Sequence, residues 1–225
     1  MSSPTPDPTA WWNINVPAAQ HTVNVPVELS DCSARDIGLI GVPDASYAPL
    51  SWERCKKIVA ANDLEAFRRS PLALRRYRQA MYRLATEHGS VAAFLANTRI
   101  GWGQGPLHPR GQVPFEEPDD YKIVYNDWPY GIDTRIVHLV VWTKFPLCED
   151  PETGRLTEVA AKQIDEFVGR TFCTHVPAKN VIWFKNWSAI KSVQALEHLH
   201  IMMFEPDADF IRDITNGDRP LCEKF

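Results

Sequence analysis

Two histidines separated by one residue, His198 and His200, are the side chains in this sequence best suited to chemistry. The apolar residues around them favour a β-strand, and alternation along a strand would place both imidazoles on one face. Such a pair would act as acid and base or bind a metal. A metal would need a further ligand, and His138 is a candidate if its strand lies next door. We expect a catalytic or substrate-binding pair and no metal site; surface histidines are the alternative.

A second group of functional side chains lies in the run NDWPYG, from Asn126 to Gly131, directly after a predicted strand. The proline and the glycine of this run make the chain turn. The turn would present Asn126, Asp127, Trp128 and Tyr130 at the end of the strand. A plain turn, with Asp127 bonding its own backbone, is the alternative, but it does not need two aromatic rings. We therefore expect a binding role.

A third group begins in the run WFKNW at residues 183–187 and continues to Ser192. Aromatic walls combined with amide, ammonium and hydroxyl groups suit a concave small-molecule site. The candidates are Trp183, Asn186 and Ser192. A core strand that ends in a polar loop is the alternative.

Positive charge is concentrated in seventeen residues, Phe67 to Arg83. The whole chain has 24 Lys and Arg against 28 Asp and Glu, a net charge of -4, whereas this segment carries +6, so the remainder sums to -10. The six residues are Arg68, Arg69, Arg75, Arg76, Arg78 and Arg83. Four of them, Arg75, Arg76, Arg78 and Arg83, lie off the apolar stripe of the helix predicted from Pro71 and would face water, where arginine suits phosphate. We expect a nucleic-acid footprint; a solvated helix paired with acidic neighbours is the alternative.

Helices are predicted before strands, which favours an α+β fold with N-terminal helices packed on a mostly antiparallel sheet. Helices should begin after the capping residues Ser51, Ser70, Ser90 and Thr157, and a last one should cover Pro206–Ile214. The expected strands are Tyr121–Tyr125, Ile136–Phe145, Val181–Lys185 and Leu196–Phe204. Residues 1–48 should form an irregular arm with a short strand at Thr22–Glu28, and residues 49–225 a single catalytic domain. The Gly/Pro-rich stretch 101–118 is a lid or a surface loop.

Composition excludes several classes of protein. The apolar fraction of 44% is that of a globular chain, and no window is long and apolar enough for a transmembrane helix. The five cysteines include no C-x-x-C pair, which argues against a disulfide framework or a cysteine zinc site. The N-terminus does not read as a secretory signal. We expect a cytoplasmic protein without membrane association and, since no phosphate-binding loop is present, without a cofactor.

Two resemblances to known families follow from these motifs. The order of Asp127-Trp128-Pro129, His138 to Lys144, Asn186, Ser192 and His198/His200 resembles distantly the layout of histidine-triad nucleotide-binding proteins, although Met202 replaces their third histidine. A closer resemblance, over Ser51 to Phe204, is to the fungal N-acetylglucosamine-induced-protein family. It is carried by YNDWPYG at 125–131, HLVVWTK at 138–144, VIWFKN at 181–186 and EHLH at 197–200.

That family resemblance implies an activity, because the arginine-containing cyclodipeptide synthases of fungi lie within or beside this family. These enzymes use aminoacyl-tRNAs to make cyclo-Arg-Xaa dipeptides. The partners would be arginyl-tRNA and a second aminoacyl-tRNA, held by the arginine-rich helix. No ATP is needed, since the tRNA ester is already activated.

The resemblance also implies roles for the candidate residues. The catalytic residues would be His200, His198, Asp127 and Lys144, with an imidazole taking the amine proton and Lys144, Asn186 or Ser192 stabilising the oxyanion. A carboxylate among Asp127, Asp119, Asp120 and Glu197 would receive the arginyl guanidinium. Aromatic residues would wall the second amino acid. The substrate-binding set is Asn126, Trp128, Tyr130, Trp183, Asn186, Ser192, Glu197 and Asp120.

Other readings stay open. The reaction proceeds by direct attack or through a covalent aminoacyl-enzyme, for which Ser192, Cys148 or Cys173 would be the nucleophile. The runner-up function is a histidine-dependent nucleotide hydrolase or nucleotidyltransferase. A third is a non-catalytic metabolite-binding protein. The second amino acid and the oligomeric state are not predicted.

Overall fold

The computed structural model describes residues 5–186 and 196–224 of the 225-residue chain. A four-stranded antiparallel sheet lies at its centre, with the strand order β1-β2-β4-β3. The strands are β1 (Tyr121–Tyr125), β2 (Ile136–Thr143), β3 (Val181–Phe184) and β4 (Glu197–Phe204). The predicted α+β fold is confirmed, and each predicted strand ends within two residues of the observed one.

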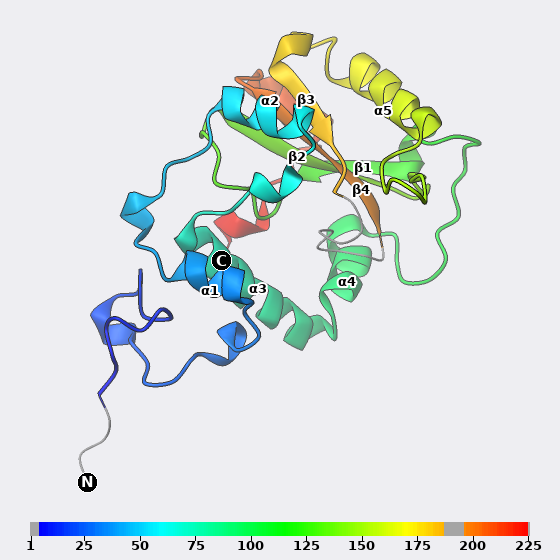
Figure 1. Ribbon diagram of the computed structural model, residues 1–225. Coiled ribbons are helices and arrows are strands. Elements are labelled where there is room, and N and C mark those ends of the chain that lie inside the picture. Colours follow the sequence, from blue (N-terminus) through cyan, green and yellow to red (C-terminus); the bar gives the residue numbers. More distant parts are fainter. Residues whose placement is uncertain (1–4, 187–195, 225) are drawn as a thin grey trace.

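One face of the sheet is covered by α5 (Glu158–Thr171), as Figure 1 shows. Leu199, Ile201 and Met203 of β4 point to this side and are fully buried. They pack with Ile164 and Phe167 of α5, in the largest apolar cluster of the described residues. The short helix α6 (Ala208–Ile214) follows β4 and adds Ile211 to the cluster. This face is a closed hydrophobic core.

Three helices lie on the opposite side of the sheet (Figure 1): α2 (Trp52–Ala60), α3 (Pro71–His88) and α4 (Val91–Phe94). The side chains of Ser51, Ser70 and Ser90 cap them by accepting backbone N–H bonds, as predicted. Gly89 ends α3 with a φ of 79°, a conformation that favours glycine. A π-helical segment, Leu95–Ile100, continues from α4.

The N-terminal arm packs on α3 and holds one helix, α1 (Ala34–Ile40). Leu29 and Ile40 of the arm contact Leu74 of α3 in a small apolar cluster. The strand predicted at Thr22–Glu28 is wrong. Pro26 precedes a 3₁₀ turn at Val27–Leu29 instead, because proline removes a donor that a paired strand needs.

The Gly/Pro-rich stretch 101–118 has no helix or strand up to residue 117, and a 3₁₀ helix begins at Pro118. It passes over the α5 side of the sheet, where Phe115 is buried and stacks on Phe167 with ring centroids 4.3 Å apart. Among the described residues, no helix combines the length and apolar character needed to cross a bilayer.

Candidate functional site

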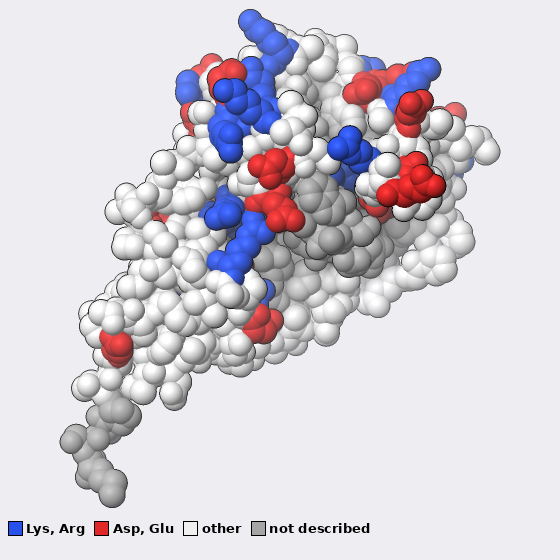
Figure 2. All heavy atoms as spheres, in the orientation of Figure 1, with Lys and Arg blue, Asp and Glu red and all other residues white. Residues whose placement is uncertain are grey.

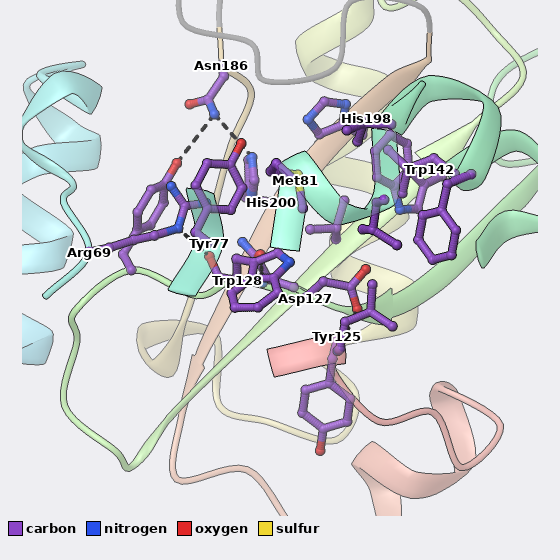
Figure 3. A pocket seen from close by; sticks show the side chains of 18 of the residues that line it. Arg69, Tyr77, Met81, Tyr125, Asp127, Trp128, Trp142, Asn186, His198 and His200 are labelled. Atoms are coloured by element: carbon purple, nitrogen blue, oxygen red, sulfur yellow. Dashed lines mark hydrogen bonds between the residues drawn. The ribbon is translucent and has the colours of Figure 1, made fainter. Parts of the chain in front are cut away.

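A cavity of about 240 Å³ opens on the sheet face opposite α5 (Figure 3). Its walls come from α3, α4, the Asn126–Tyr130 turn, β2, β4 and the end of β3. Seven residues of the three predicted polar and aromatic groups line it: Asn126, Asp127, Trp128, Tyr130, Asn186, His198 and His200. The predicted arginines Arg69 and Arg78 line it as well. Segments far apart in the chain therefore meet at one place, as the sequence interpretation expected of these three groups.

A chain of hydrogen-bonding side chains runs across the sheet at this cavity, from Asn126 after β1 through His138 of β2 and His200 of β4 to Asn186 after β3. Nδ2 of Asn126 lies 3.1 Å from Nε2 of His138, and that nitrogen lies 3.0 Å from Nδ1 of His200. Nε2 of His200 is 3.2 Å from Nδ2 of Asn186, which also lies 3.4 Å from the Tyr130 hydroxyl. Because an amide nitrogen only donates, Nε2 of His200 accepts and its Nδ1 carries the proton toward His138.

Burial keeps His138 and His200 neutral. It lowers the pKa of His138 to about 3, with the nearby positive charge of Arg69 adding to the effect. Burial also lowers the pKa of His200 well below its ordinary value, reinforced by His138, His198 and Arg69. These two rings are therefore neutral hydrogen-bonding groups at physiological pH.

His198 occupies a different environment from His200. Its Nδ1 lies 3.1 Å from the carbonyl oxygen of Leu196, to which it must donate, because a carbonyl only accepts. In the neutral ring Nε2 then carries the lone pair. The ring packs against Trp142, with centroids 4.5 Å apart, and lines the cavity. His198 therefore has the tautomer required of a general base.

The Asn126–Gly131 turn is held on both sides by tight contacts. Oδ1 of Asn126 accepts the backbone N–H of Trp128 at 3.0 Å. At Gly131, a Cβ atom would collide with the ring of Tyr47, so glycine is required for this close approach. The turn therefore positions Trp128 and Tyr130 against the cavity rather than leaving them on a loose loop.

Asp127 is bound by a buried arginine. Nε of Arg99 lies 3.0 and 2.9 Å from the two Asp127 oxygens, and the backbone N–H of Leu221 donates to the same carboxylate at 3.0 Å. The two terminal nitrogens of Arg99 each lie 2.6 Å from an oxygen of Asp218. Burial raises the pKa of Asp127, and Arg99 opposes that rise. This carboxylate ties the turn to the C-terminal segment.

Four predicted residues lie away from the cavity. Lys144 and Asp120 are paired at 3.4 Å where β1 begins and β2 ends, and neither is among the described lining residues. Burial alone would raise the pKa of Asp120, but backbone donors of Gly111 and Arg110 outweigh it and lower the pKa. Trp183 and Glu197 point toward the α5 side, where Trp183 donates to Asp165 at 2.8 Å and Glu197 pairs with Lys185 at 3.5 Å. Ser192 lies outside the described residues.

The six arginines do not form one solvent-facing surface, so that prediction is wrong. Arg75 is only 5% exposed, because the N-terminal arm covers it and the carbonyl of Trp12 accepts its hydrogen bond. Arg78 is paired with Asp31 of the arm, and Arg83 with Glu87 on the next turn at 2.7 Å. On the face seen in Figure 2, basic and acidic side chains are intermixed over the described surface.

Three arginines remain at the start of α3. Arg68 and Arg76 are exposed. Arg69 donates to the Trp128 carbonyl at 3.0 Å and lies 4.0 Å from the centroid of the Tyr77 ring. Arg69 and Arg76 line a second cavity of about 440 Å³, which shares Trp128 and Tyr130 with the first. Of the six predicted arginines, Arg68, Arg69 and Arg76 therefore remain as a basic surface at the opening of the two cavities.

Sequence reasoning missed important members of the site. His138 was considered only as a metal ligand; β2 does lie next to β4, but His138 serves as the middle of the hydrogen-bond chain. Arg99 and Asp218 carry no local sequence signal for their pairing, since they lie 119 residues apart. Within the described residues, no group of three side chains is arranged to hold a metal ion.

Known proteins are similar to this chain in sequence and in fold. It is 24% identical over 188 residues to N-acetylglucosamine-induced protein 1 of Candida albicans, covering 75% of this chain and 74% of that protein. It is 25% identical over 159 residues to Uncharacterized protein YPL067C of Saccharomyces cerevisiae, covering 69% of this chain and 79% of that protein. A solved structure titled Crystal Structure of HTC1 shares the fold, with a TM-score of 0.63 and 23% identity over 74% of this chain and 96% of that one.

A protein family also matches directly. The family described as Protein of unknown function (DUF3605) matches residues 51–204, the same span over which the motifs resemble the fungal N-acetylglucosamine-induced proteins. That part of the resemblance is confirmed. The chain belongs to the DUF3605 family, whose matched region contains most of the side chains that line the cavity.

Proposed function

We propose that this protein is an aminoacyl-tRNA-dependent cyclodipeptide synthase that joins arginine to a second amino acid. The single observation that supports it best is the position of His198, whose basic Nε2 belongs to a ring lining a cavity in the family's most specific motif region. Amide formation from an activated ester requires an uncharged amine, and a neutral imidazole is a suitable proton acceptor.

In the proposed reaction, the α-amine of one aminoacyl-tRNA attacks the ester carbon of the other. A C–N bond forms, the ester C–O bond breaks, and the ribose hydroxyl of one tRNA leaves. His198 accepts the amine proton and returns it to the leaving oxygen. The free amine of the resulting dipeptidyl-tRNA then attacks its own ester in the same way, which closes the ring and releases the second tRNA.

We adopt direct attack as the route, because it requires no nucleophilic side chain; Ser192, the serine candidate for a covalent route, lies outside the described residues. Tyr130 accepts a hydrogen bond from Asn186, which leaves its own hydroxyl proton to donate to the oxyanion. Lys144 and Asp127, both predicted to be catalytic, have no role in this scheme, because Lys144 is paired with buried Asp120 outside the cavity lining and Asp127 is bound by Arg99.

The tRNA would approach over the start of α3. Arg68 and Arg76 are exposed there, and Arg69 lines both cavities. Phosphate contacts of this kind give salt-dependent affinity without sequence specificity. Aminoacyl-tRNAs are cytoplasmic, so we place the protein in the cytoplasm.

Reconstitution tests the proposal. Purified protein is mixed with arginyl-tRNA and a set of other aminoacyl-tRNAs, and products are analysed by mass spectrometry. We expect an arginine-containing cyclic dipeptide that disappears when the tRNAs are first digested with RNase. A product that survives RNase, or no cyclic dipeptide with any aminoacyl-tRNA, would overturn the proposal; mononucleotide turnover instead would favour the nucleotide hydrolase.

A further inference from the structure

The cavity on the β4 face has two unlike sides. Figure 3 shows Asn186 and Arg69 at one side and Trp142 at the other, with His200 and Met81 between them. The apolar side continues into the cluster formed by α3, α4 and β2, whose cavity-lining members include Met81, Leu84, Phe94, Leu95, Val140 and Trp142. A ligand that fills this cavity must therefore combine a polar head with a large apolar group.

Asn186 provides an unused acceptor at the polar side. Its side chain is 5% exposed, and its Nδ2 is committed to Tyr130 and His200. Among the described residues, its Oδ1 has no hydrogen-bond partner. Buried polar atoms are almost always paired in native proteins, so a lone buried acceptor at a cavity indicates a ligand with an N–H donor.

The charges around the cavity disfavour a cationic side chain. Asp127 is the one carboxylate among the described lining residues, and Arg99 and the Leu221 amide already occupy it. Arg69 adds a positive charge to the wall, whereas the charge of Arg78 is balanced by its pair with Asp31. An arginyl guanidinium would gain no free carboxylate here and would face the like charge of Arg69.

The volume also limits the ligand. About 240 Å³ lies below the ~300–1,000 Å³ usual for small-molecule pockets, which suits one amino-acid-sized group rather than a nucleotide. The positive wall helps the proposed chemistry, because it disfavours an ammonium and thereby favours the neutral, nucleophilic amine.

We infer that this cavity is the subsite for the second amino acid, that it takes a large apolar or aromatic side chain, and that arginine binds elsewhere. Its α-amine donates to Oδ1 of Asn186, in the cavity that His198 also lines. The side chain enters the apolar side, where Met81 and Trp142 set the size accepted. This assignment rests on the proposed function for the identity of the ligand, but its binding properties can be measured without tRNA.

Calorimetric titration with aminoacyl amides tests the inference, since these compounds keep the amine and the side chain and lack the tRNA. At pH 8.5 we expect tryptophanamide to bind about tenfold more tightly than either argininamide or glycinamide. Met81→Trp fills the apolar side and should weaken tryptophanamide binding at least about tenfold. Tyr82→Trp is the matched control: it makes the same side chain at the adjacent position, which is 45% exposed, and should leave affinity unchanged.

A second variant keeps the test decisive if Met81→Trp does not fold. Asn186→Leu removes the acceptor and should also weaken tryptophanamide binding about tenfold or more. Equal affinity for argininamide and tryptophanamide, or unchanged binding in either folded variant, would overturn the inference. If tryptophanamide binds as expected while no cyclic dipeptide forms in the reconstitution, the proposed function fails and the subsite assignment stands.

Discussion

The two faces of strand β4 show how one segment serves two purposes. Leu199, Ile201 and Met203 face α5 and belong to an apolar core cluster. On the other face, His198 and His200 line a cavity, and His200 belongs to a hydrogen-bond chain. Both sets are buried. Burial alone therefore does not distinguish a core residue from a functional one; the polar network and the adjoining cavity do.

The largest effect on stability should come from the α5 face. Ile201→Ala removes a fully buried side chain and should lower the free energy of unfolding by about 2–5 kcal/mol, because a cavity remains in a packed core. Urea denaturation measures this. The protein that remains folded should keep its activity per molecule. A lower activity per folded molecule would contradict the claim that the α5 face takes no part in the chemistry.

At His200, the neighbouring position on the cavity face, we expect a large loss of activity and a small loss of stability. His200→Phe keeps an aromatic ring next to Phe184, whose ring centroid lies 4.9 Å away, but removes the bonds to His138 and Asn186. We expect product formation to fall about 100-fold, equivalent to about 2.7 kcal/mol. The free energy of unfolding should fall by only about 1–2 kcal/mol. Steady-state kinetics and urea denaturation of the same preparation compare the two losses.

Acid should affect the cavity face selectively. The pKa of His138 is lowered to about 3 and that of His200 also lies well below its ordinary value, so both are neutral in the folded protein while the unfolded chain protonates them below about pH 6.5. Their contribution is fully present above that pH and is lost as pH falls toward their folded pKa values. The loss should be about 1.4 kcal/mol per pH unit for each histidine.

Two variants isolate this acid effect. His138→Leu should reduce the slope of unfolding free energy against pH between about pH 6.5 and 4, because only His200 of the two buried histidines remains. Ile201→Val, on the α5 face, should shift the whole curve without changing its slope. Parallel curves for wild type and His138→Leu would show that the buried histidines are not the acid-sensitive groups.

The smallest effects on stability are expected at two arginines of α3, Arg76 in its first half and Arg83 in its second half. Arg83→Ala removes an exposed helical pair with Glu87 and should cost about 0.3–0.5 kcal/mol of stability without changing tRNA affinity. Arg76→Ala should leave stability unchanged and lower the slope of log affinity against log salt by about 1. Filter binding at several salt concentrations measures the tRNA affinity of both variants. An equal change in the salt dependence of the two would contradict a tRNA-binding surface at the opening of the cavity.

Local patterns in the sequence predicted the elements well. Ser70-Pro71 and Gly89 marked the two ends of α3, and alternation correctly placed His198 and His200 on one face. These features depend on neighbours within a few residues of each other. The family resemblance, and not these local patterns, assigned Asn126 to Tyr130 and the histidines to one site.

Long-range packing explains what the sequence did not reveal. Arg75 looked solvent-facing because the helical pattern takes no account of the arm that covers it. Asp127 looked like a free carboxylate because nothing near it indicates Arg99, which lies 28 residues earlier in the chain. Trp183 was assigned to the site, but strand alternation turns it toward Asp165 of α5.

Metabolite profiling of a host that expresses this protein tests the division between the two faces most directly. Wild type and Leu199→Val, a mild change on the α5 face, should both produce an arginine-containing cyclic dipeptide. His198→Gln, on the cavity face one residue away, should be folded and produce none. The same dipeptide from His198→Gln at wild-type levels, or no such compound from the wild type, would contradict the assignment of chemistry to this cavity.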